Sequence, residues 1–217
     1  TVTAPVGITA TSELYSTAIA SDAGSNRIAL AAKNANEEVW LAVWDGSAWG
    51  NTLVATTSGV ELTEDHPTMS LAFESQSGDL LAAYGKSAGP NVYYRTWSVG
   101  GGWSSELTGP STGGTDVPYV VKLYADPHSN SIMMGVQDNA QDLHYVLWNG
   151  SNWGAVQTVE ITTGETYREN FTYVWYENAK PVISDLAGDA MVHTVGDGAK
   201  VIGSCDGGTK KLTYLRK

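Results

Sequence analysis

Trp44–Trp49, with the sequence WDGSAW, is the stretch that decides the fold, because near-copies of it return as WSVGGGW at Trp97–Trp103 and as WNGSNW at Trp148–Trp153. In each copy two tryptophans flank a glycine turn, and an apolar run lies on either side, which is typical of two strands joined by a tight hairpin. The first tryptophans of the copies are 53 and then 51 residues apart. The chain therefore carries an internal repeat of roughly fifty residues.

Each copy belongs to a longer unit with four strand-like runs, which in the first unit are residues 17–20, 27–32, 39–44 and 49–54. Four short strands per unit at this period are the signature of a β-propeller, in which each unit is one four-stranded antiparallel blade. A β-sandwich also has short alternating strands, but it does not require the same sequence at each hairpin. We therefore predict an all-β protein with a single β-propeller domain over residues 1–217. The repeats are expected at residues 15–58, 66–112, 118–163 and 167–217.

The end of the chain departs from this pattern. The run at 171–176 starts a fourth unit and further strand-like runs follow, but no Trp-Gly-Trp turn appears. This predicts about four blades, with five as the alternative because residues 167–217 hold more than four such runs. Residues 7–12 form a strand-like run without partners, and we expect them to complete the last blade. Closure of the ring would remove exposed sheet edges.

Composition and charge exclude several classes of partner. The formal net charge of −11 argues against nucleic acid and anionic membrane surfaces, which attract clustered Lys and Arg. A single cysteine excludes an internal disulfide, and no apolar run is long enough to span a membrane. The chain starts at Thr1 without a leader, and it is rich in Thr, Ser, Asn and Gly but poor in Lys. We expect a processed mature protein in an extracellular or cell-surface location.

The repeated turn resembles those of secreted and cell-surface β-propeller repeats that carry Trp-x-Gly-x-x-Trp. It is also loosely similar to the Asp-box hairpin of sialidase-type propellers, in which a Ser or Thr and an Asp precede a Gly and an aromatic residue. Asp45–Trp49 matches part of that pattern, Asn149 replaces the Asp in the third copy, and Val99–Gly102 breaks the pattern in the second. The resemblance implies a propeller fold, and propellers host enzymes, lectins and scaffolds alike.

The third strand of each unit supplies the candidate ligand-binding residues. Trp40, Tyr93 and His144 each lie four residues before the first tryptophan of a turn, so strand alternation places them on the face of that tryptophan. Arg95, on the same strand as Tyr93, completes the candidate set. Aromatic faces stack on sugar rings and their polar tips form hydrogen bonds, so these residues would suit shallow glycan sites. The alternative is that they pack between blades.

Catalytic and metal chemistry have little support in the sequence. A sialidase needs a cluster of arginines, and the chain has four scattered ones. The four histidines lack ligand spacing and are expected at the surface. The loop with Asp138, Asn139 and Asp142 offers oxygen ligands that would suit calcium, but it lacks the glycine and terminal glutamate of a helix-loop-helix calcium site, so a solvated hairpin is favoured. We predict no catalytic residues, no metal and no cofactor.

The predicted function is therefore a non-enzymatic extracellular module. It would recognise glycan or protein at a cell surface, or serve as the subunit of an extracellular assembly. The alternative is a glycoside hydrolase or lyase, because 23 acidic residues offer many carboxylate pairs. The incomplete last unit also predicts self-association through terminal strands.

Overall fold

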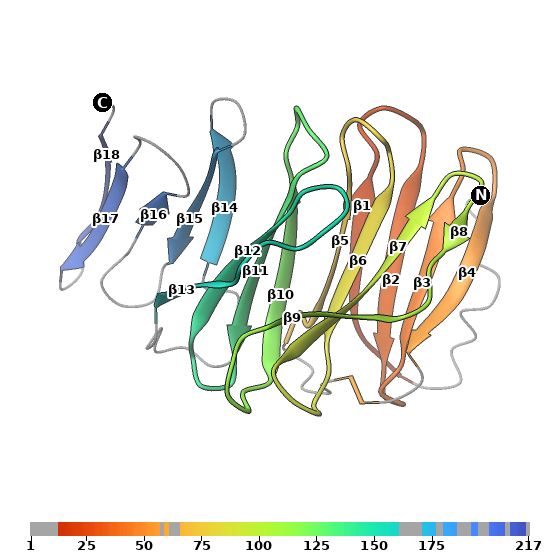
Figure 1. Ribbon diagram of the computed structural model, residues 1–217, viewed down its shortest axis with the longest axis horizontal. Coiled ribbons are helices and arrows are strands. Elements are labelled where there is room, and N and C mark those ends of the chain that lie inside the picture. Colours follow the sequence, from red (N-terminus) through yellow and green to blue (C-terminus); the bar gives the residue numbers. More distant parts are fainter. Residues whose placement is uncertain are drawn as a thin grey trace.

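The computed structural model describes residues 13–56, 59–60, 66–160, 171–176, 180–185, 192–194, 200–206 and 209–215. Throughout this part of the chain the secondary structure consists of β-strands and turns, arranged as successive antiparallel sheets (Figure 1). It includes no helix that could span a membrane. Residues 7–12, predicted to complete the last blade, lie outside the described residues.

Sheets 1 and 3 each contain four strands that are consecutive in sequence and adjacent in space. Sheet 1 consists of β1 (Leu14–Ser21), β2 (Ile28–Asn34), β3 (Val39–Trp44) and β4 (Trp49–Thr56). Sheet 3 consists of β10 (Pro118–Ala125), β11 (Ile132–Asp138), β12 (Leu143–Trp148) and β13 (Gln157–Glu160). Because all pairs are antiparallel, the first and third turns of each sheet lie at the same end, which we call the turn end.

Sheet 2 has an interrupted last strand. It contains β5 (Met69–Phe73), β6 (Leu80–Gly85), β7 (Asn91–Ser98), β8 (Gly102–Trp103) and β9 (Leu107–Ser111), and both β8 and β9 pair with β7. The first unit has one continuous run after its Trp-Gly-Trp turn, whereas here residues 104–106 separate β8 from β9. The run breaks because the Ser104 side chain takes over a ladder position: its Oγ accepts the Thr96 N–H at 3.0 Å, while its own N–H donates to the Thr96 carbonyl at 2.8 Å.

The C-terminal part contains two smaller sheets. One consists of β14 (Phe171–Tyr176), β15 (Lys180–Asp185) and β16 (Val192–Thr194), and the other of β17 (Lys200–Asp206) and β18 (Thr209–Leu215). The run at 171–176 and the strand-like runs predicted after it are strands. Because they divide between two sheets, the choice between four and five blades stays a prediction.

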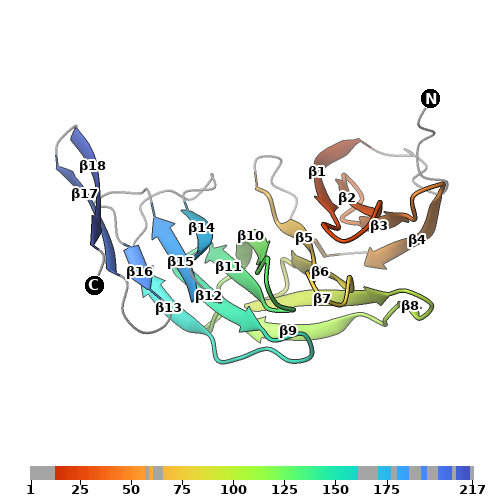
Figure 2. The same ribbon diagram turned by 90° about the horizontal axis from the view of Figure 1, so that it is seen from above.

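The sheets follow one another along an arc (Figure 2). The first strands are neighbours, with β5 lying between β1 and β10. Sheet 1 and the β17–β18 hairpin lie at opposite ends of the arc. This places the first strands on the inner side, and the later strands of each sheet further out.

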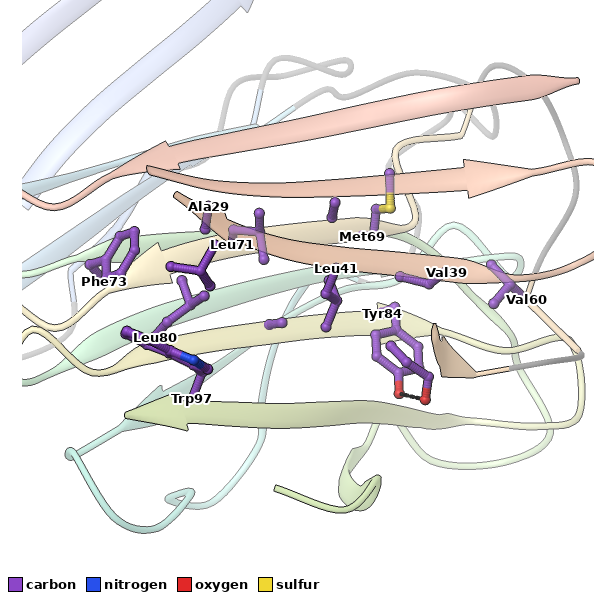
Figure 3. Packing of buried hydrophobic residues seen from close by; sticks show 14 residues of the cluster. Ala29, Val39, Leu41, Val60, Met69, Leu71, Phe73, Leu80, Tyr84 and Trp97 are labelled. Atoms are coloured by element: carbon purple, nitrogen blue, oxygen red, sulfur yellow. Dashed lines mark hydrogen bonds between the residues drawn. The ribbon is translucent and has the colours of Figure 1, made fainter. Parts of the chain in front are cut away.

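The hydrophobic core lies between neighbouring sheets. Figure 3 shows Ala29, Val39 and Leu41 of sheet 1 opposite Leu71 and Tyr84 of sheet 2. A second cluster joins the other face of sheet 2 to sheet 3, and a third joins sheet 3 to Phe171 and Trp175 of β14. Each large side chain buried in this way contributes about 1.5–3 kcal/mol. Sheet 2 is covered on both faces, which explains why every residue of β6 is buried.

Candidate functional site

Three turns at the turn end begin with a buried carboxylate. In each turn the acid follows the first strand of its sheet and accepts a hydrogen bond of 2.6 Å from the hydroxyl of the serine three residues later. The pairs are Asp22 with Ser25, Glu74 with Ser77, and Asp126 with Ser129, and the acids are 4%, 5% and 0% exposed. This hydrogen bond fixes the turn and the direction of the carboxylate.

Between sheets 2 and 3, the carboxylate of Glu74 is also bound by a repeated tryptophan. The indole Nε1 of Trp148 donates to Glu74 Oε1 at 2.7 Å, which ties the WNGSNW hairpin of sheet 3 to the first turn of sheet 2. The Trp148 ring lies edge-to-face with Trp153 at 5.2 Å and with Tyr94 of β7 at 5.8 Å. Such aromatic contacts hold the rings rigidly.

These groups line a pocket of about 240 Å³ between sheets 2 and 3. The lining residues are Glu74, Asp79, Leu80, Tyr94, Thr96, Leu107, Trp148, Gly150 and Ser151. The lining thus combines two carboxylates, the hydroxyls of Thr96 and Ser151, and the rings of Tyr94 and Trp148, and it contains no lysine or arginine. Hydroxyl-bearing ligands with apolar faces fit this chemistry.

Asp79 supplies the carboxylate of the pocket that is left free. Both oxygens of Glu74 are used, one by Trp148 and one by Ser77. The Asp79 carboxylate accepts no hydrogen bond from the described residues. Burial raises its pKa, and the nearby charge of Arg27 opposes this shift only in part. A desolvated carboxylate without donors gains from a ligand that supplies them.

Arg27 stands at the position of sheet 1 that corresponds to Asp79 in sheet 2, and it fills the space between sheets 1 and 2. Its Nε and Nη2 donate to Asp22 Oδ2 at 3.1 and 2.6 Å, and its guanidinium carbon lies 5.9 Å from the Trp97 ring centre. Gly78 makes room for it, because a Cβ there would collide with the Arg27 guanidinium. Burial alone would raise the pKa of Asp22, but hydrogen bonds from Ser25, Gly24 and Arg27 hold this pKa below its ordinary value.

The predicted ligand residues occupy equivalent positions in three different sheets. Trp40 on β3 donates its Nε1 to Glu38 at 3.1 Å, and Tyr93 on β7 lies under the Lys86 ammonium, 4.5 Å from the ring centre. His144 on β12 is 3% exposed. The structure therefore does not bring these three aromatics into one site, and none of them lines the pocket between sheets 2 and 3.

Arg95 lies near Tyr93 on the same face of β7. All three of its donor nitrogens bind backbone oxygens: Nε and Nη2 donate to Ala55 O at 2.9 and 2.8 Å, and Nη1 donates to Ser104 O at 2.6 Å. Arg95 thus ties sheet 2 to β4 of sheet 1. Ligand binding by Trp40, Tyr93, Arg95 and His144 stays a prediction.

The loop considered for calcium is a repeated turn. Ligand atoms of Asp138, Asp142 and His144 lie within 4.8 Å of one another, and Asp138 Oδ1 accepts the N–H groups of Ala140 and Asp142 at 3.0 Å. The Asn139 side-chain oxygen accepts the Val117 N–H at 2.8 Å.

Sheet 1 builds the same turn from other residue types. Asn34 stands in the position of Asp138, and its Oδ1 accepts the N–H groups of Asn36 and Glu38 at 3.0 and 3.1 Å. Glu38 and Trp40 stand in the positions of Asp142 and His144. Because an amide and an indole serve equally well in this turn, the shared geometry indicates a structural role.

Two histidines expected at the surface are buried. His66 is 0% exposed and stacks on Tyr119 at 4.3 Å between ring centres, and His144 contacts Asp138 Oδ2 through Nε2 at 3.1 Å. The surface prediction was wrong for both, because it rested on scattered sequence positions alone. Burial depends on which sheet face a neighbouring sheet covers.

The pocket residues Glu74, Asp79 and Tyr94 were missed by the sequence analysis. A signal for Glu74 was present: an acid followed by a serine three residues later recurs at Asp22, Glu74 and Asp126, at intervals of 52 residues. No comparable signal exists for Asp79, because Arg27 and Ser131 stand at the corresponding positions of the other turns.

The repeated turn itself does not depend on an Asp-box. Asp45 Oδ1 accepts the N–H groups of Ser47 and Ala48 at 2.8 and 2.9 Å, and Asn149 Oδ1 accepts the equivalent pair, Ser151 and Asn152, at 3.0 and 2.8 Å. Asp and Asn are interchangeable in such turns. The similarity to sialidase-type hairpins is not shown.

No family model matches the chain, and no curated protein matches it. Among solved structures, the lectin SapL1 in complex with α-methyl fucoside matches with a TM-score of 0.54 and 16% identity, covering 92% of this chain and 64% of the lectin chain. AofleA from Arthrobotrys oligospora matches with a TM-score of 0.57 and 12% identity, covering 94% of this chain and 57% of its own. The chain thus spans less than two thirds of the length of these structures. At this identity the comparisons show the fold: an all-β chain with antiparallel sheets that match those of propeller lectins.

Proposed function

We propose that the chain is a glycan-binding module whose site is the pocket between sheets 2 and 3. The observation that carries this proposal is the free carboxylate of Asp79 beside the rings of Tyr94 and Trp148. Sugar hydroxyls would donate to Asp79, and the apolar face of a sugar ring would lie against the aromatic wall.

The charge of the site favours a neutral glycan. Its lining includes two carboxylates and no cation, so a sialic acid or uronic acid would meet unfavourable charge. Because the matched lectin SapL1 was solved with α-methyl fucoside, a neutral fucoside is the first ligand to test. An extracellular or cell-surface location is part of the same proposal.

The chemistry of this pocket favours binding over hydrolysis. Glycoside hydrolysis requires two carboxyl groups to act on one bond. Here both oxygens of Glu74 are held by Trp148 and Ser77, which leaves Asp79 as the free carboxylate of the lining.

The proposal is tested by calorimetry with α-methyl fucoside and by a glycan array. We expect saturable binding to the wild-type chain and at least a roughly tenfold loss of affinity for Asp79→Asn, because a hydrogen bond to a charged group contributes about 1.5–3 kcal/mol. Glu13→Gln is the matched control, since Glu13 is exposed and precedes the opposite end of β1. Equal affinity of the wild-type chain and Asp79→Asn would contradict the site. Release of reducing sugar from chromogenic glycosides would favour the hydrolase.

A further inference from the structure

The space between sheets 1 and 2 shows which kind of group fits between the first-turn acid of one sheet and the tryptophan of the next. The Arg27 guanidinium lies there, with Nε and Nη2 donating to Asp22 Oδ2 at 3.1 and 2.6 Å and its carbon 5.9 Å from the Trp97 ring centre. A positive charge thus contacts a buried carboxylate and an aromatic ring at once. Both contacts favour a cation.

The pocket between sheets 2 and 3 has the same two walls without the cation. Glu74 and Trp148 are the equivalents of Asp22 and Trp97 in the repeat, and both line the pocket of about 240 Å³. A carboxylate, that of Asp79, stands where sheet 1 has the guanidinium. The exchange of one residue thus removes a positive charge from this space and adds a negative one.

The two acids of the pocket are only partly compensated by charge. Glu74 is 5% exposed, and its carboxylate accepts hydrogen bonds from the Trp148 indole and the Ser77 hydroxyl, which are both neutral donors. Burial raises the pKa of Asp79, and the charge of Arg27 on the other side of sheet 2 opposes this shift only in part. A desolvated carboxylate without a close cation is costly, so a positively charged ligand would relieve both acids.

We infer that this pocket binds a sugar that carries a protonated amino group. The inference rests on the proposed glycan-binding function and narrows the ligand to amino sugars. The ammonium would occupy the place that the Arg27 guanidinium holds in the neighbouring interface, beside Glu74, Asp79 and the Trp148 ring. A neutral sugar would still donate its hydroxyls to Asp79, but it would leave the charge of the two carboxylates uncompensated.

The space beside the pocket favours a compact ammonium over a second guanidinium. In the neighbouring interface Gly78 makes room for Arg27, because a Cβ at this position would collide with the guanidinium. The corresponding residue of sheet 3 is Asn130, which docks the first turn of sheet 2 onto its own by accepting the N–H groups of Gln76 and Ser77 at 3.0 and 2.9 Å. A guanidinium in the pose of Arg27 would therefore meet the Asn130 side chain, whereas an ammonium needs less space.

Calorimetry with matched sugars tests the inference. The methyl glycosides of glucosamine, glucose and N-acetylglucosamine differ only at C2, and the galactose series repeats the comparison with another ring configuration. We expect the amine to bind at least about tenfold more tightly than its hydroxyl counterpart in one series or both, because charge-assisted hydrogen bonds are the stronger ones. N-acetylation should abolish the gain. Asp79→Asn should lose most of it, and the exposed control Glu13→Gln should keep it.

Three outcomes would overturn the inference. The first is equal affinity for the amine and the hydroxyl sugar in both series. The second is a gain that Asp79→Asn retains while its circular dichroism matches the wild-type chain, because the cation would then bind elsewhere. The third is a lysine amide with a blocked N-terminus that binds as tightly as the amino sugar, which would assign the pocket to basic peptides.

The neutral ligand α-methyl fucoside separates this test from that of the proposed function. If the fucoside binds and Asp79→Asn weakens it, but the amino sugars show no gain, the glycan site stands and the inference on the amine fails. If amino sugars bind through Asp79 and the fucoside does not, the inference stands and the neutral ligand is wrong. If no sugar binds, both proposals fail.

Discussion

Sheets 1 and 2 meet at the turn end through Asp22, Arg27 and Trp97, whereas sheets 2 and 3 meet there through Glu74, Asp79 and Trp148. The acid and the tryptophan are common to both interfaces. The residue five positions after the acid differs, and it decides whether the space is filled by a cation or left open beside a carboxylate.

The shorter acid also changes the bonding of the tryptophan. Glu74 reaches the indole N–H of Trp148, but Asp22 is one methylene shorter and is bound by Arg27, so Trp97 Nε1 has no hydrogen-bond partner. An ion pair thus fills the interface between sheets 1 and 2, whereas the interface between sheets 2 and 3 keeps an open pocket with fixed side chains. Mutations can separate these two designs.

The largest expected effect is that of Arg27→Met. It leaves the buried Asp22 carboxylate without its cation, which should lower the free energy of unfolding by about 3 kcal/mol. Urea unfolding measures this loss. The double variant Asp22→Asn/Arg27→Met should recover more than half of it, and a double variant as unstable as the single one would show that Arg27 acts through packing.

A smaller effect separates the two tryptophans. Trp148→Phe removes the donor of Glu74, and Trp97→Phe removes an N–H without a partner. We expect Trp148→Phe to be less stable than Trp97→Phe by about 2 kcal/mol, the cost of an unsatisfied buried acceptor. Each substitution removes the same atoms, so the pair is its own control in urea unfolding. Equal losses would mean that the hydrogen bond to Glu74 has no net value.

The smallest effect is a contrast in pH dependence between Asp22 and Asp79. The pKa of Asp22 is lowered in the folded state, so its charge stabilises the fold above the ordinary value of 3.8, and this contribution is lost as the pH falls below it. The pKa of Asp79 is raised, so its charge opposes folding above 3.8.

Asp79→Asn should therefore be slightly more stable than the wild-type chain at pH 7, and Asp22→Asn less stable. Both differences should shrink as the pH falls below the ordinary value of 3.8, and thermal unfolding over a pH series would show this. A destabilised Asp79→Asn at pH 7 would mean that its attraction to Arg27 outweighs desolvation. If Asp79→Asn is more stable than the wild-type chain and binds the ligand less tightly, Asp79 is a functional residue whose charge lowers the stability of the fold.

The hairpins were predictable because their determinants are local. Trp44 pairs directly with Trp49, and Trp97 with Trp103, so short sequence spacing carries the information. Strand alternation also predicts that Trp40 and His144 share a strand face with Trp44 and Trp148. The sequence could not say which faces are covered, since that depends on the neighbouring sheet.

The candidate pocket was beyond sequence reasoning for the same reason. Its defining hydrogen bond joins Glu74 and Trp148, which are 74 residues apart. The repeat period relates equivalent positions of different sheets, but a site between sheets combines positions that are not equivalent. Only the packing of one sheet on the next brings the first turn of one beside the third turn of the other.

The docking of one first turn onto the next by Asn130 has a consequence for how such a chain evolves. Asn130 Oδ1 of sheet 3 accepts the backbone N–H groups of Gln76 and Ser77, which any residue except proline can supply, while the side chains of Ser75 and Gln76 add bonds to the carbonyls of Asp126 and His128. The backbone part of this contact would therefore be available to a duplicated unit without matched substitutions in its first turn. Duplication or loss of one unit would thus keep this part of the interface, whereas the side-chain bonds would have to be regained by substitution.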